Sequence, residues 1–111
     1  MQATETRYTT FTDFWPFYVS QHRDARNRAM HFIGTTIANV SILLIVLTFD
    51  LVFIPIGLVG SYGFAWAGHF FFEKNKPATF TYPLLSVFGD YHMYWLMLQG
   101  KMSAEVKRLA S

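Results

Sequence analysis

The chain has 111 residues, of which 52% are hydrophobic and 19% aromatic, whereas only 14% are charged and none is cysteine. A soluble domain carries about 25% charged residues, so this composition argues against a fully water-facing surface, and the lack of cysteine excludes disulfides and thiolate chemistry. The net charge is only +2, and the basic residues flank apolar segments instead of forming a stripe, which argues against a nucleic-acid partner and suits anionic membrane lipid.

Three segments in the first two thirds of the chain predict membrane helices. Residues 11–28 are aromatic and predict a helix lying in the membrane interface. Residues 31–49 and 51–72 each lack charge and are long enough to cross the hydrocarbon core, which takes about 20 residues. Only Asp50 separates them, so we predict an all-α membrane protein built on a transmembrane helical hairpin. Two buried helices of a soluble protein are the alternative.

Small residues recur at helix-contact spacing in both predicted spans. Gly34 and Ala38 are four residues apart in the first, and Gly57, Ser61 and Ala65 follow the same spacing in the second. Such residues let membrane helices approach closely. We expect these faces to pack, and because two spans make a thin core we also expect a homo-oligomer.

The last third of the chain is apolar but interrupted. Residues 78–100 contain Pro83, Gly89 and Asp90, and a charge at the bilayer centre costs roughly 3 kcal/mol. We expect a re-entrant or interfacial pair of helices that breaks near Gly89, with a tilted third span as the alternative. Residues 103–110 predict a short basic helix, and the whole chain, 1–111, forms one membrane domain.

Charge predicts the orientation of the hairpin. Three arginines precede the first span and two lysines follow the second, which places both ends of the hairpin in the cytoplasm. No cleavable signal peptide is evident in the sequence. We expect an integral protein of the inner membrane in a bacterium, or of the endoplasmic reticulum in a eukaryote, with its site on the cytoplasmic side.

The four histidines are placed where they can meet. In an antiparallel hairpin His31, at the start of the first span, neighbours His69, near the end of the second. His22 precedes them on the same membrane face, and His92 lies in the segment that folds over it. Imidazoles suit iron, zinc and copper, and two histidines with a carboxylate are typical of oxygen-activating non-haem iron. We predict a metal or catalytic site at His22, His31 and His69; isolated headgroup contacts are the alternative.

Several other residues are candidates for completing this site. Glu73 follows His69 by four residues and is a possible ligand or the partner of a nearby lysine, and Asp90 is a possible ligand or a helix cap. His92 is a further possible ligand. A polar stripe that ends at Asn39 leads from His31 into the membrane, where buried polar groups need partners.

Two stretches resemble a known family: residues 22–34, HRDARNRAMHFIG, and residues 68–78, GHFFFEKNKPA. They are similar to the small membrane proteins related to the 2-hydroxy fatty acid dioxygenase of phytosphingosine breakdown. The resemblance implies an Fe(II) enzyme that uses O₂ to shorten 2-hydroxy long-chain fatty acids by one carbon. The residues that match the family pattern are His22, Asn27, His31, His69, Glu73 and Pro77. Asp24 departs from it, because an asparagine is usual there.

The substrate that this resemblance implies would need polar contacts for its carboxylate. We expect them from Arg26, Arg28, Lys74 and the amides of Asn27 and Asn39, since arginine and lysine pair with carboxylates. Two other functions stay open: a non-enzymatic membrane scaffold or lipid-binding subunit, and a zinc-dependent membrane hydrolase.

Overall fold

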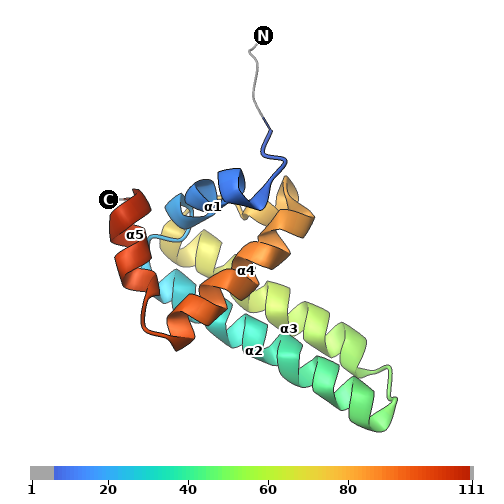
Figure 1. Cartoon of the computed structure of the whole chain (residues 1–111). Coiled ribbons are helices and arrows are strands. Elements are labelled where there is room, and N and C mark those ends of the chain that lie inside the picture. The colour runs from blue at the N-terminus through green and yellow to red at the C-terminus, as the bar shows by residue number, and fades with distance from the viewer. Residues whose placement is uncertain (1–6, 111) are drawn as a thin grey trace.

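The computed structural model describes residues 7–110, and every regular element within this range is helical. The elements are α1 (Phe11–Ser20), α2 (Ala25–Thr48), α3 (Phe53–Gly68), the π-helical turn η1 (His69–Glu73), the 3₁₀ turn η2 (Ala78–Phe80), α4 (Pro83–Leu98) and α5 (Met102–Ala110). The predicted all-α class is confirmed. Helices α2 and α3 project together to one side, and α1, α4 and α5 gather around their other end (Figure 1).

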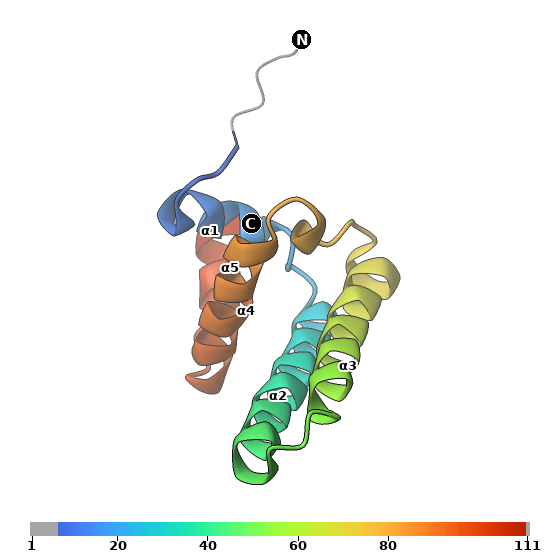
Figure 2. The same cartoon turned by 90° about the vertical axis from the view of Figure 1, so that its right-hand side faces the viewer.

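The hairpin of α2 and α3 is antiparallel and closely packed (Figure 2). Phe49 ends α2 in the left-handed conformation, with φ at 57°, and its N–H donates to the carbonyl of Ile45 at 2.8 Å. A Cβ placed on Gly34 would lie 2.6 Å from the carbonyl oxygen of Ser61, so only glycine permits this approach. The predicted packing of the small residues is therefore confirmed within one chain, and the homo-oligomer stays a prediction.

One helix in the described part of the chain, α2, is long and apolar enough to cross a membrane. Helix α3 has 16 residues, but η1 follows it directly with five more, so the chain stays helical from Phe53 to Glu73. The end of the hairpin remote from the histidines exposes large apolar side chains, and Phe49 is 84% exposed. An apolar surface of this kind marks contact with lipid or with another protein.

The helix predicted over residues 11–28 is divided in two. Helix α1 ends at Ser20 and α2 begins at Ala25, earlier than the predicted start at residue 31. The break has a local cause, because the side chain of Asp24 accepts a hydrogen bond from the N–H of Arg26 and caps α2. The short loop between the two helices carries His22.

The break predicted near Gly89 is wrong. Helix α4 runs unbroken through this residue, and the glycine instead permits a close approach between α4 and α1. A Cβ at Gly89 would lie 2.6 Å from the ring of Tyr18 on α1. Asp90 consequently lies within the helix and does not cap it. The predicted basic helix over 103–110 corresponds to α5.

A buried apolar core joins α1 to α4 and α5. Its members are Phe14, Trp15, Tyr18, Val19, Ala78, Met93 and Met102. The indole N–H of Trp15 donates to the carboxylate of Glu105 at 2.6 Å, which ties α5 to this core. The core therefore fixes α1 against the open end of the hairpin, and with it the loop that carries His22.

Candidate metal centre

Three histidines from separate parts of the chain meet at the open end of the hairpin. His22 lies in the loop after α1, His31 on α2 and His69 at the first residue of η1. Each offers a nitrogen, and these nitrogens all lie within 4.8 Å of one another. The rings are 1%, 5% and 2% exposed. The predicted meeting of the three histidines is thus confirmed, and one metal ion is able to reach all three rings.

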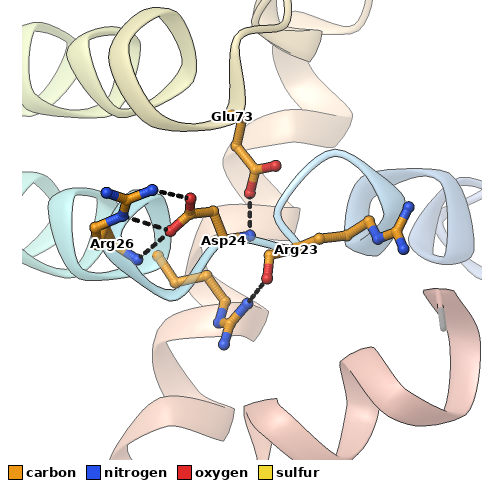
Figure 3. Close-up of polar contacts among 5 residues, drawn as sticks. Arg23, Asp24, Arg26 and Glu73 are labelled. Atoms are coloured by element: carbon orange, nitrogen blue, oxygen red, sulfur yellow. Dashed lines mark hydrogen bonds and ion pairs between the residues drawn. The ribbon is translucent and has the colours of Figure 1, made fainter.

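A buried arginine holds the loop that carries His22. The guanidinium of Arg28 donates to the carbonyl of His22 at 2.9 Å and to the carbonyl of Arg23 at 2.8 Å. Figure 3 shows the second of these bonds, together with the bond from the N–H of Asp24 to the carboxylate of Glu73. These contacts fix the loop from both sides, because Arg28 comes from α2 and Glu73 from η1.

The turn η1 and the residues after it position His69. Lys74 adopts the left-handed conformation, with φ at 59°, and the N–H of Asn75 returns to the carbonyl of His69 at 3.1 Å. The side-chain oxygen of Asn75 lies 2.7 Å from Nδ1 of His69, and its Nδ2 donates to the carbonyl of Gln21 at 3.2 Å. A π turn inside a helix often accompanies a functional site. Asn75 was not among the residues predicted from the sequence.

In two of the three rings Nδ1 has a polar partner, which leaves Nε2 available for a metal. Nδ1 of His22 lies 2.6 Å from the carbonyl of Tyr18, and Nδ1 of His69 faces Asn75. A carbonyl can only accept, so Nδ1 of His22 carries the hydrogen and its Nε2 keeps a lone pair. Metal-binding histidines characteristically donate their other N–H to a fixed acceptor.

Asp90 lies beside Nδ1 of His31, as the carbonyl of Tyr18 lies beside Nδ1 of His22 and Asn75 beside Nδ1 of His69. Its Oδ1 lies 3.2 Å from Nδ1 of His31, within ion-pair distance but without the alignment of a hydrogen bond. The same oxygen accepts a short hydrogen bond from the hydroxyl of Tyr18. Burial, and then the charge of Asp90, raise the pKa of Tyr18 well above 10.0, so the phenol stays a donor. Asp90 therefore supports a histidine from behind, as carboxylates do in carboxylate–histidine–metal sites.

The donor set fits a divalent transition metal. The Nε2 atoms of His22 and His31 are buried and have no hydrogen-bond partner in the described residues, and buried polar atoms are normally satisfied. Burial, with a smaller contribution from the neighbouring histidines, lowers the pKa of His22 well below 6.5. The ring is therefore neutral at physiological pH, which is the form that binds a metal.

Asn27 is a buried amide beside this cluster. It precedes His31 by one helical turn and is 0% exposed, and neither side-chain atom has a partner in the described residues. A Cβ at Gly68, the residue before His69, would lie only 2.2 Å from Oδ1 of Asn27. The amide thus fills the space between α2 and the end of α3, with its hydrogen-bonding capacity unused.

Two of the predicted additional ligands lie elsewhere. The carboxylate of Glu73 accepts from the N–H of Asp24. His92 is partly buried and packs on Trp15, a member of the core of α1, α4 and α5, with ring centroids 4.5 Å apart. The cluster of potential ligands in the described residues contains the three histidines and no carboxylate.

Of the residues predicted to bind substrate, Arg26 and Asn39 already have partners within the protein, whereas Lys74 has none in the described residues. The guanidinium of Arg26 pairs with Asp24 at 2.8 Å and lies over the ring of Phe72, so it is already engaged. Lys74 is exposed and its ammonium has no partner within residues 7–110. Asn39 accepts a hydrogen bond from the hydroxyl of Tyr91 at 2.7 Å, which links α2 to α4.

Residues 8–102 match the model of the family described as 2-hydroxy-palmitic acid dioxygenase Mpo1-like. The match spans most of the chain and includes every histidine. The chain belongs to this family. No curated protein and no solved structure matches it at a significant level. Membership in the Mpo1-like family confirms the resemblance seen in the two sequence blocks, and the family name points to dioxygenase chemistry.

Proposed function

We propose that the protein is an Fe(II)-dependent dioxygenase that shortens 2-hydroxy long-chain fatty acids by one carbon at a membrane interface. The observation that carries the proposal is the cluster of three buried imidazoles in a chain of the Mpo1-like family. In two of them, His22 and His31, Nε2 has no hydrogen-bond partner in the described residues. Imidazole donors with open positions suit non-haem iron that activates oxygen.

We further propose that the hairpin crosses the bilayer and that the histidines lie at headgroup depth on the cytoplasmic side. Support comes from the apolar surface of the remote end of the hairpin and from the basic residues near the open end. A fatty acid placed in the same way keeps its tail in lipid and brings only its head to the histidines. Depth thus explains why chemistry would occur beside the carboxylate carbon.

Each group near the histidines has a role in this proposal. His22, His31 and His69 would hold the iron, which supplies the sites where oxygen and the hydroxy acid react. Arg23 and Lys74 are exposed cations next to the cluster, and neither side chain has a polar partner in the described residues, so they are placed to attract a carboxylate. The amide of Asn27, which has no hydrogen-bond partner among residues 7–110, is available to hydrogen-bond the substrate head.

The test is to purify the protein without oxygen, add Fe(II) and 2-hydroxypalmitate, and then admit O₂. We expect oxygen uptake and a C15 product by mass spectrometry. His31→Ala should lose both iron and activity, whereas His92→Gln, which changes a histidine outside the cluster, should keep both. Turnover without oxygen in a zinc-loaded protein would favour the hydrolase. A wild-type protein that retains no metal would favour the scaffold or lipid-binding subunit.

A further inference from the structure

A cavity of about 180 Å³ opens directly beside the histidine cluster, between α2, α3 and α4. At one end it is lined by His31, Thr35 and Asp90, which are polar. Farther from the cluster its walls include Ala38 and Leu58. The cavity therefore begins at the candidate metal ligands and becomes apolar with distance from them.

A second cavity, of about 240 Å³, continues along the seam of the hairpin. Both cavities are lined by Ala38, Leu58 and Ser61, so they adjoin at these three residues. The second cavity then extends past Ile45 to Phe53 at the remote end of the hairpin. Together they form one groove, defined here as the hairpin groove, with a polar mouth and an apolar body.

The length of the hairpin groove suits a single acyl tail. From His31 to Ile45 the helix advances 14 residues, or roughly 21 Å at 1.5 Å per residue. An acyl tail spans about half of the bilayer hydrocarbon core, or roughly 15 Å. The distance from His31 to Ala38 is roughly 10 Å by the same rise, so only the longer chains would pass the junction of the two cavities.

We propose that the hairpin groove binds the acyl tail of the substrate, and that Ala38 and Leu58 at the junction determine which chain lengths are accepted. The proposal rests on the proposed function for the identity of the substrate head. The continuity of the groove with His31 selects this occupant, because a tail lying here places its own carboxyl end at the cluster. A bulk membrane lipid has no such reason to begin at the histidines.

The test measures binding without turnover, in the metal-free protein and in the absence of oxygen. The probes are 2-hydroxyoctanoate and 2-hydroxypalmitate, and the affinities come from displacement of a fluorescent fatty acid. Ala38→Phe should weaken binding of the long acid at least about tenfold, as apolar pockets discriminate by such factors, and should leave the short acid within about threefold. Leu58→Trp fills the same junction from α3 at a half-exposed position and should act likewise.

The matched control is Val40→Phe, which adds the same ring to an exposed position of α2 outside both cavities. If both junction variants keep the chain-length profile of Val40→Phe, the groove holds only annular lipid and the proposal is wrong. Loss of both acids in a junction variant that still binds iron would equally overturn the assignment of chain length. Failure of the proposed function looks different: the long acid would bind with the expected selectivity, yet the iron-loaded wild type would consume no oxygen.

Discussion

Replacing Asp90 by asparagine should weaken iron binding although Asp90 lies outside the group of three histidines that would hold the metal. The carboxylate lies 3.2 Å from Nδ1 of His31 and is held by the hydroxyl of Tyr18, so it orients the ring and increases the basicity of Nε2. Asparagine keeps the size and an acceptor oxygen but removes the charge. Loss of such a supporting group costs about 10–100-fold in metal affinity, or about 1.4–2.8 kcal/mol.

The assay is anaerobic titration of the metal-free protein with Fe(II) against a competing chelator, with circular dichroism to confirm the helical fold. Asp50→Asn, in the loop at the remote end of the hairpin, makes the same chemical change far from the cluster and should leave the affinity unchanged. If Asp90→Asn is folded and binds Fe(II) within about twofold of wild type, the carboxylate does not support His31 and this reasoning fails.

Three further predictions concern the elements that position the cluster. Gly68→Ala should destabilise the protein by about 1–3 kcal/mol because the new Cβ would lie 2.2 Å from Oδ1 of Asn27. Gly63→Ala is the control, since its Cβ meets nothing within 4 Å, and equal unfolding midpoints for the two variants would contradict this prediction. Arg28→Met should lower the Fe(II) affinity while leaving most of the helix content, because it removes the guanidinium that binds the carbonyls of His22 and Arg23. An unchanged affinity would show that the loop keeps its conformation without Arg28. Hydrogen bonds from Arg108 and then Trp15 lower the pKa of Glu105 below 4.5, so the carboxylate contributes stability that is present above about pH 4.5 and lost as the pH falls through the lowered pKa. Glu105→Gln should therefore make the thermal stability less dependent on pH in that acid range, and an unaltered pH profile would refute the assignment.

The meeting of His31 and His69 could be predicted because it depends only on two long apolar runs joined by a short turn. Helix length and antiparallel direction then decide which ends are neighbours, whatever the details of packing. The addition of His22 followed for the same reason, since the segment before the first span must begin at the same face. These inferences use one property, hydrophobic length, that a single sequence shows directly.

The groups that support the histidines could not be predicted in this way. Tyr18 and Asp90 are 72 residues apart and meet only after α1 docks on α4. Glu73 was expected beside His69 on the assumption of an α-helix, but η1 has π-helical bonds from i to i+5. The wider turn removes the i, i+4 alignment on which that expectation depended. Asn75 reaches His69 only through the left-handed turn at Lys74, which nothing in the composition indicates.

The spacing of the three histidines along the chain has a consequence for folding. An ion bound by His22, His31 and His69 would close one short loop and one much longer loop of the chain, and restricting a long loop removes more entropy from the unfolded state. This sequence has no cysteine, so the ion would serve as the cross-link that a disulfide provides in other small proteins. The supply of iron would then determine the stability of the folded protein as well as the fraction of molecules that are active.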